Sequence, residues 1–299
     1  MSSSAPRKHD PHRLPPIGIL AGWGRLPLSV ARGARGQGRR VVALGVRDHA
    51  DPELESLCDE FAWIGLGSVG RAIRLFRQWG VEQAVLAGKI RKVELFRPGW
   101  WMRHRPDWKC LRTFSAQLLG RKDRKDDTLL LTLVEAFAEA GVVFEPATHF
   151  APDLLVDEGC VAGRALTAKQ LRDVEFGWRL ARQMGGLDVG QTVCVKNQAV
   201  LAIEAMEGTD ACIRRAGELC ERSGFTVVKV AKPAQDMRFD VPTVGLHTLA
   251  SLDAAGADVL AIETGMTILL DEIEFRRRAK SLKISVIARS DDTLLRAAA

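Results

Sequence analysis

The stretch IGILAGWGRLPLSVA, residues 17–31, decides the class of fold. Its first five residues are apolar and end at the glycine turn Gly22-Trp23-Gly24, after which Pro27 precedes apolar residues at helical spacing. A buried strand that turns at glycines into a helix accounts for this order, because proline fits the first turn of a helix. The sequence therefore predicts a strand–turn–helix unit at the start of an α/β domain.

The same alternation of apolar runs and helical patterns continues through the first half of the chain. Further buried strands are predicted at residues 41–46, 61–64, 84–87 and 142–145. Among them lies a helical pattern that Ser68 is placed to cap and Gly80 to end. Strands that alternate with helices predict a parallel sheet with helices on both faces, and hence a Rossmann-like domain.

The second half of the chain predicts another α/β domain. Apolar runs of strand length lie at residues 192–195, 200–203, 226–230, 259–262, 268–270 and 284–288. Helical patterns follow Thr167 and occupy residues 209–220 and 247–254. The expected organisation is a disordered extension at 1–13, a Rossmann-like domain at 14–155, a linker at 156–166 and a catalytic α/β domain at 167–290.

Length and composition narrow the class of protein. With 299 residues, 46% of them hydrophobic, the chain is long enough for two domains with buried cores. The six cysteines include no Cys-x-x-Cys pair, and no histidine cluster has metal-ligand spacing, so neither a zinc site nor a disulfide framework is indicated. No apolar run approaches the roughly 20 residues of a membrane-spanning helix, and the polar start is unlike a signal sequence. We therefore expect a cytoplasmic protein with reduced thiols.

Positive charge is concentrated between Lys89 and Lys125, here called the basic window. It holds twelve Lys or Arg against three acids, together with Trp100, Trp101 and Trp108. Such a segment attracts an anionic partner, and exposed indoles beside basic groups favour a membrane surface. Nucleic acid is the competing partner for this charge and is not expected, because no recognised nucleic-acid module accompanies it. A membrane or nucleic-acid adaptor stays open as an alternative function.

The glycine turn offers a second interpretation of the first domain. Gly22 and Gly24 end a strand and precede a helix, where backbone amides can bind a phosphate group. Pro27 occupies the place of the third glycine of a dinucleotide-binding motif and removes one amide donor. An NAD(P)-dependent oxidoreductase remains an alternative function, with Asp48 as the candidate acid for the ribose.

Carboxylates cluster where a strand of the second domain turns into a helix. Glu204, Glu207 and Asp210 lie within seven residues, and Thr209 or Asp210 is also placed to cap the helix. Capping leaves the two glutamates unexplained, whereas hard oxygen ligands at this density suit Mg²⁺, or Mn²⁺, beside a phosphate. We expect Asp210 and Glu207 to be metal ligands, with Glu204 as an alternative.

The segment from Lys232 to Gly245 follows another strand directly. It has two prolines and no hydrophobic periodicity, and parallel sheets bind ligands in the loops at the carboxyl ends of their strands. Lys232 and Arg238 are suited to neutralise phosphoryl oxygens. Asp240 is expected to hold the metal or orient a water molecule, with Asp236 as an alternative ligand.

Three motifs in this half resemble one family closely. They are DVGQ at 188–191, EAMEGTD at 204–210 and KPAQDMRFDVPTVG at 232–245. The chain resembles, over nearly its whole length, the UDP-2,3-diacylglucosamine pyrophosphatase family of lipid A biosynthesis, the metal-dependent two-domain type unrelated to calcineurin-like phosphoesterases. The turn at Gly22 and Gly24 and the pair Asp126-Asp127 also look like it. The basic window is richer in basic residues and tryptophan than the family suggests.

The resemblance implies hydrolysis of UDP-2,3-diacylglucosamine to UMP and 2,3-diacylglucosamine 1-phosphate (lipid X), a step toward lipopolysaccharide. It implies Mg²⁺ as cofactor and a homodimer on the cytoplasmic face of the inner membrane, bound peripherally, with a nucleotide-sugar lipid as substrate. The aspartate of the Arg-Phe-Asp-x-Pro motif, Asp240 here, is implied to be essential. Asp240, Asp210 and Lys232 are therefore the expected catalytic residues. The expected substrate-binding residues are Gly22, Gly24, Gln191, Thr209, Gln235 and Arg238.

Overall fold

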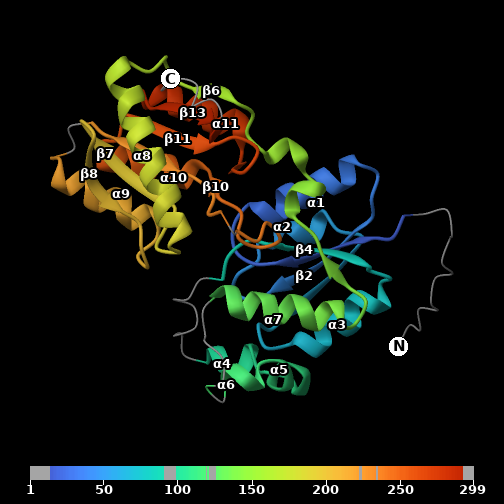
Figure 1. Ribbon diagram of the computed structural model, residues 1–299. Coiled ribbons are helices and arrows are strands. Elements are labelled where there is room, and N and C mark those ends of the chain that lie inside the picture. The colour runs from blue at the N-terminus through green and yellow to red at the C-terminus, as the bar shows by residue number, and fades with distance from the viewer. Residues whose placement is uncertain are drawn as a thin grey trace. The chain divides into compact units, whose positions relative to one another are not determined.

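The computed structural model describes residues 14–90, 99–118, 120, 126–221, 224–233 and 235–291. The chain divides into two compact units, Met1–Ala151 and Pro152–Ala299, each with its own sheet (Figure 1). Among these described residues, no helix combines the length and apolarity needed to cross a membrane.

The first unit is a five-stranded parallel sheet in the order β3-β2-β1-β4-β5. Its strands are β1 (Ile17–Ala21), β2 (Val41–Val46), β3 (Glu60–Ile64), β4 (Gln83–Ala87) and β5 (Val143–Phe144). The strand order reverses beside β1, which is the arrangement of a doubly wound α/β sheet. The predicted Rossmann-like domain is confirmed.

Helices cover both faces of this sheet, as Figure 1 shows. One face packs against α1 (Leu26–Gly36) and α2 (Glu53–Ser56), which bury apolar side chains against β1, β2 and β4. The other face packs against α3 (Val69–Gln78) and α7 (Asp126–Ala138), where the Phe76 and Phe137 ring centroids lie 6.1 Å apart. Ser68 occupies the N-cap position of α3, as predicted, but its side chain makes no capping hydrogen bond.

In the described part of the basic window, β4 is followed by the short helices α4 (Trp100–Arg103), α5 (Trp108–Thr113) and α6 (Ser115–Leu118). Asp107 attaches them to the domain, because its carboxylate accepts hydrogen bonds from the amides of Cys110 at 2.8 Å and Arg71 at 3.0 Å. His104 is buried and its Nδ1 accepts from the Leu66 amide at 3.0 Å. Residues 91–98, 119 and 121–125 of the window lie outside the described residues.

The second unit has a six-stranded sheet in the order β6-β13-β11-β9-β7-β8. Its strands are β6 (Gly159–Ala162), β7 (Thr192–Lys196), β8 (Ala199–Ile203), β9 (Thr226–Lys229), β11 (Val259–Glu263) and β13 (Ser285–Arg289). The central strands β9, β11 and β13 are parallel, while β6, β7 and β8 each run antiparallel to a neighbour. The predicted 268–270 strand lies apart from this sheet: β12 (Ile268–Leu269) pairs with β10 (Thr243–Val244).

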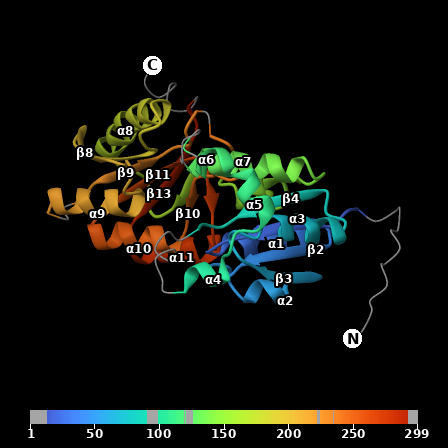
Figure 2. The same ribbon diagram turned by 90° about the horizontal axis from the view of Figure 1, so that it is seen from below.

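Helices cover both faces of this sheet, as Figure 2 shows. One face packs against α8 (Ala168–Gly186), which begins at a capping box formed by Thr167 and Gln170. The opposite face carries α9 (Thr209–Leu219), α10 (Leu246–Ala255) and α11 (Glu272–Ser281). Residues 156–166, expected as a linker, contain β6, which pairs with β13 at the edge of the sheet. They therefore form part of the second unit.

Candidate functional site

Polar side chains gather at one edge of the second sheet, where β8, β9, β11 and β13 end and β7 begins. Along β9, Val227 is buried under α9 and α10, and because side chains alternate in a strand, Lys229 points to that same face. In β7, Cys194 is buried on this face, and Thr192, two residues before it, therefore points to the same face. Thr192 lies directly opposite Lys229 in the sheet, so strand register alone brings these two side chains together.

Lys229 and Thr192 form a polar row at this edge of the sheet. Thr209, at the start of α9, connects the row to a buried carboxylate. The Lys229 ammonium donates to its hydroxyl at 3.2 Å, and that hydroxyl donates to Glu204 Oε1 at 3.0 Å. Lys229 is 7% exposed and Glu204 8% exposed, so a cation and an anion share a nearly dry environment. Thr192 Oγ1 lies 3.5 Å from Thr209 Oγ1. Of these four residues, the sequence singled out only Glu204 and Thr209; Lys229 and Thr192 were missed.

Close backbone approach explains the position of Glu204. A Cβ at Gly190 would collide with the Glu204 carbonyl oxygen, so glycine at 190 lets the two segments meet. Two buried acceptors here, Glu204 Oε2 and Gln191 Oε1, have no hydrogen-bond partner within the described part of the chain. Gln191, an expected substrate-binding residue, therefore sits beside the row with one unused acceptor.

The other two carboxylates of the cluster turn toward basic side chains. Glu207 Oε1 lies 2.5 Å from Arg215, and its Oε2 accepts from the Ala205 amide at 3.1 Å. Backbone hydrogen bonding, followed by the bond from Arg215, lowers the pKa of Glu207 below its usual value. Asp210 Oδ2 lies 3.2 Å from His247 Nδ1. Adjacency in sequence thus does not bring Glu204, Glu207 and Asp210 to one point.

The loop after β9 holds its charged groups in local pairs. Arg238 forms a two-pronged contact with Asp236, at 2.9 and 2.5 Å, and this hydrogen bonding lowers the pKa of Asp236. The Asp240 amide donates to the Asp236 carbonyl at 2.9 Å, which makes residues 236–240 a compact turn. The Lys232 ammonium lies 2.8 Å from Asp188.

Gln235 organises the beginning of this loop. Its Oε1 accepts a hydrogen bond from the Lys232 amide at 2.7 Å, and its Nε2 is buried without a partner among the described residues. The expected substrate-binding glutamine is thus a loop residue with one unused donor.

The carboxylates expected to hold Mg²⁺ do not converge. Among the residues that the structure describes, no group of three or more His, Cys, Asp or Glu side chains is placed to hold a metal ion. Glu207, Asp210 and Asp236 each pair with a basic side chain instead. As arranged, this donor set does not fit Mg²⁺, which takes about six oxygen ligands in octahedral geometry.

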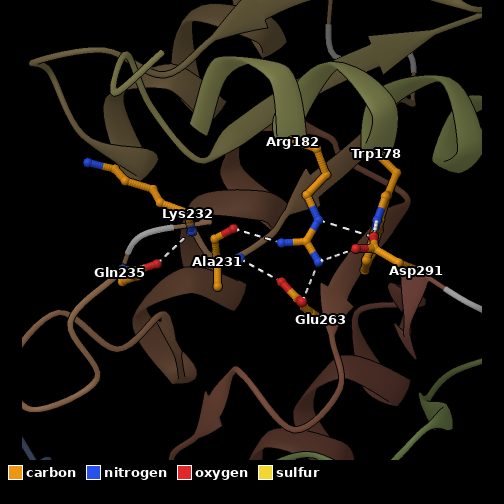
Figure 3. A network of polar contacts seen from close by, with 7 residues as sticks. All are labelled: Trp178, Arg182, Ala231, Lys232, Gln235, Glu263 and Asp291. Carbon is orange, nitrogen blue, oxygen red and sulfur yellow. Dashed lines mark hydrogen bonds and ion pairs between the residues drawn. The ribbon is translucent and has the colours of Figure 1, made fainter. Parts of the chain in front are cut away.

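A second polar network lies on the opposite face of the same sheet edge (Figure 3). Arg182 of α8 donates to Glu263 Oε1 at 2.5 Å, to the Ala231 carbonyl at 3.0 Å and to both carboxylate oxygens of Asp291. Trp178 adds a bond of 2.6 Å to Asp291. Burial alone would lower the pKa of Arg182, but its hydrogen bonds to Asp291 and Glu263 outweigh burial and raise that pKa. The sequence carried no signal for this network, because its members are far apart along the chain.

The glycine turn of the first unit is occupied by backbone contacts. The Gly22 amide donates to the Ala87 carbonyl at 2.8 Å and the Trp23 amide to the Lys89 carbonyl at 2.8 Å. Gly22 and Gly88 meet so closely that a Cβ on either would contact the backbone of the other turn. Two of the amides expected to face a phosphate are therefore bonded to backbone carbonyls. A Cβ at Gly24, whose φ is +111°, would face open space.

Asp48, the candidate for ribose binding in an oxidoreductase, is also engaged. Its Oδ1 accepts from Arg103 at 3.0 Å and its Oδ2 lies 3.2 Å from His104 Nε2. Both oxygens therefore attach the segment around α4 to the end of β2. This geometry does not favour the NAD(P) alternative.

Comparison with solved structures finds similarity over only part of the chain. A UDP-glucose-4-epimerase from Stenotrophomonas maltophila, with bound NAD and formylated UDP-arabinopyranose, is 12% identical with a TM-score of 0.28, covering 43% of this chain and 35% of that one. The biotin carboxylase domain of a single-chain bacterial carboxylase is 14% identical with a TM-score of 0.25, covering 55% of this chain and 29% of that one. The chain thus spans about a third of each.

Sequence comparison finds similarity along almost the entire chain. A protein of Caulobacter vibrioides described as UDP-2,3-diacylglucosamine pyrophosphatase LpxI is 28% identical over 283 residues, 92% of this chain and 94% of that protein. Residues 16–154 match the LpxI N-terminal domain and residues 157–287 match the LpxI C-terminal domain. Because both domains match in order and together take in the two units of the fold, the chain belongs to the LpxI family.

Proposed function

We propose that the protein hydrolyses the pyrophosphate bond of UDP-2,3-diacylglucosamine, releasing UMP and 2,3-diacylglucosamine 1-phosphate in lipid A biosynthesis. The observation that carries this proposal is the match to a pyrophosphatase of that name over 92% of this chain and 94% of the relative. Similarity through both domains supports a shared reaction better than a match to one domain would, since a single fold hosts many activities.

The chemistry of the second unit supports a pyrophosphate substrate. Lys232 and Arg238 lie in the loop that leaves the carboxyl end of β9, and Lys229 is the last residue of that strand. Cations at the carboxyl edge of an α/β sheet are suited to offset the charge that builds on phosphoryl oxygens during hydrolysis. Glu207 and Asp210, paired with basic side chains, fit better as supports for α9 and α10 than as direct ligands.

Asp240 is the proposed water-orienting base. In the proposed step a water oxygen attacks a phosphorus of the pyrophosphate, Asp240 accepts the proton, and the phosphoanhydride P–O bond breaks with its electron pair leaving on the second phosphate. The turn formed with Asp236 fixes the backbone of Asp240, while Asp236 orients the Arg238 guanidinium. The Mg²⁺ or Mn²⁺ requirement, like the homodimer, stays a prediction.

A peripheral location on the inner membrane is part of the proposal. The described portion of the basic window exposes apolar side chains beside basic ones: Trp108 is 79% exposed, Met102 59% and Leu111 40%. Arg105 and Arg112 are exposed in the same segment. This composition suits an anionic bilayer surface, where a diacylated substrate resides.

The test is release of UMP from UDP-2,3-diacylglucosamine by purified protein, with Mg²⁺, with Mn²⁺ and with EDTA. Asp240→Asn is expected to lose UMP release, whereas Asp253→Asn, an exposed aspartate of α10, serves as the matched control. UDP-N-acetylglucosamine, which lacks the acyl chains, is expected to be a poor substrate. Equal activity of both variants would remove Asp240 from the reaction, and no UMP under any condition would overturn the proposed hydrolysis.

A further inference from the structure

Ala231 is held at both ends of its own backbone. Its amide donates to Glu263 Oε2 at 2.8 Å, and its carbonyl accepts from Arg182 at 3.0 Å. Arg182 and Glu263 also bond to each other at 2.5 Å, so the three residues form a closed ring of hydrogen bonds (Figure 3).

This ring sits where the loop of the proposed active site begins. Ala231 follows the end of β9 and precedes Lys232, the first residue of the segment that carries Asp240. The ring joins three elements, because Arg182 comes from α8 and Glu263 from the end of β11. The direction in which the chain leaves β9 is therefore set by two side chains from outside the loop.

Arg182 and Glu263 are suited to fix the direction in which the chain leaves β9. Glu263 is 7% exposed and the bond it makes to the Ala231 amide is buried. A planar guanidinium presents its donors at fixed angles, which a lysine ammonium does not reproduce. Asp291 holds the other side of Arg182 through Nε and a terminal nitrogen, so the guanidinium plane has little freedom to turn.

A second contact places α8 beside the same loop. Gly185, one turn along α8 from Arg182, faces Lys232, and a Cβ at 185 would be in ordinary van der Waals contact with Lys232 Cα, at 3.4 Å. Helix α8 therefore passes beside the start of the loop.

We infer that Arg182 and Glu263 are positioning residues for the loop from Lys232 to Asp240. They act through the amide and the carbonyl of Ala231, set where Lys232 and Asp240 lie at the edge of the sheet, and do not contact the substrate. The inference rests on the proposed function for the role of the loop, whereas the restraint on Ala231 stands independently of any activity.

The experiment compares Arg182→Lys and Glu263→Gln with Arg277→Lys. Arg277 makes a two-pronged pair with Glu274 on the surface of α11, at 2.8 and 2.6 Å, and within the described part of the loop it bonds to no backbone group. Displacement of reacting groups by about 1 Å costs on the order of 100-fold in rate, so kcat for UMP release is expected to fall about that much in the first two variants. Arg277→Lys is expected to stay within about twofold of wild type, because exposed pairs contribute little.

Hydrogen exchange supplies a readout that is independent of catalysis. In both loop variants, peptides covering residues 230–240 are expected to exchange faster, while the β11 and β13 strands keep their protection. Faster exchange confined to this loop together with reduced kcat supports the inference. It is overturned if protection is lost across the whole second unit, which indicates a purely structural role, or if Arg182→Lys and Glu263→Gln both keep wild-type exchange and kcat. Should wild type release no UMP, the proposed function fails while the exchange measurement still decides whether the ring restrains the loop.

Discussion

The Lys229 ammonium lies 3.2 Å from the Thr209 hydroxyl at the edge of the second sheet. Through that hydroxyl it is coupled to Glu204, so a buried cation and a buried anion share one hydrogen-bonded chain. Removing Lys229 leaves the buried Glu204 carboxylate without this cation, which is costly in a dry environment.

We expect Lys229→Met to lower the free energy of unfolding by about 1–3 kcal/mol. Because Glu204→Gln removes the matching charge, the double variant is expected to lose less than the sum of the two single losses. Urea unfolding of wild type, the two single variants and the double variant measures the coupling free energy between Lys229 and Glu204. Strict additivity would show that Lys229 and Glu204 do not interact.

Gly190 is expected to be intolerant of a side chain. A Cβ there would collide with the Glu204 carbonyl, so Gly190→Ala forces the two segments apart at a cost of about 1–3 kcal/mol. Gly186→Ala is the matched control, because a Cβ at the end of α8 meets nothing within 4 Å. The Gly186→Ala change is expected to raise the free energy of unfolding by about 0.4–1 kcal/mol. Thermal unfolding of both variants tests the contrast, and equal effects would contradict it.

Asp291 is expected to make stability depend on pH in the acid range. Burial acts to raise its pKa, but hydrogen bonds from Trp178 and Arg182 outweigh burial and lower it below the usual value. A lowered folded-state pKa means that the stabilisation is present above the unfolded pKa of about 3.9 and is lost as the pH falls through the folded pKa.

The advantage of wild type over Asp291→Asn is therefore expected to be constant from about pH 7 to pH 5 and to shrink below about pH 4. The Asp291 side chain is 51% exposed, so solvent screening keeps the difference under about 1 kcal/mol. Chemical unfolding across this pH range measures it. A difference that grows toward low pH would reverse the sign and refute the assignment.

Trp108 is expected to contribute to binding of anionic membranes. Its side chain is 79% exposed beside basic residues, and burial of such a side chain in a bilayer is worth about 1.5–3 kcal/mol. Trp108→Ser is therefore expected to weaken binding to phosphatidylglycerol vesicles by about tenfold or more. Co-sedimentation with these vesicles, and with neutral phosphatidylcholine vesicles, measures the effect.

Ile273→Ser provides the control for that experiment, because Ile273 is 88% exposed on α11 without belonging to the basic window. It is expected to bind like wild type, and binding of wild type is expected to weaken as salt concentration rises. If Trp108→Ser binds as well as wild type, the described segment is not the contact surface. Salt-sensitive binding to single-stranded DNA in place of vesicles would instead favour the nucleic-acid adaptor.

Much of the fold is legible in the sequence. Apolar runs and glycine turns located the strands of the first sheet, such as β1 and β2, because burial on both faces leaves an uninterrupted apolar signature. Helix starts with a local cause were also predictable, as at Thr167, whose capping box lies within four consecutive residues. The directions of the strands in the second unit were not predictable, since the antiparallel pairing of β7 with β9 depends on residues more than thirty positions apart.

The candidate site was also predictable only in the features that depend on local sequence. Sequence analysis pointed to the loop after β9 and to Glu204, because unusual polar residues beside an apolar strand are visible locally. It grouped Glu204 with Glu207 and Asp210 by adjacency, whereas the fold sends Glu207 to Arg215 and Asp210 to His247. A turn into a helix sends successive side chains in different directions, so neighbours in sequence separate in space.

Local patterns predicted most of the strands and helices, since periodicity and turn residues act over a few positions, but they missed β6 and α11. Which polar groups meet depends on how the chain packs: Lys229 contacts Thr209, twenty residues away, and Arg182 contacts Glu263, eighty-one residues away. The reason is physical. A buried charge must be paired, but the partner that satisfies it is selected by strand register and helix packing, which no local pattern encodes.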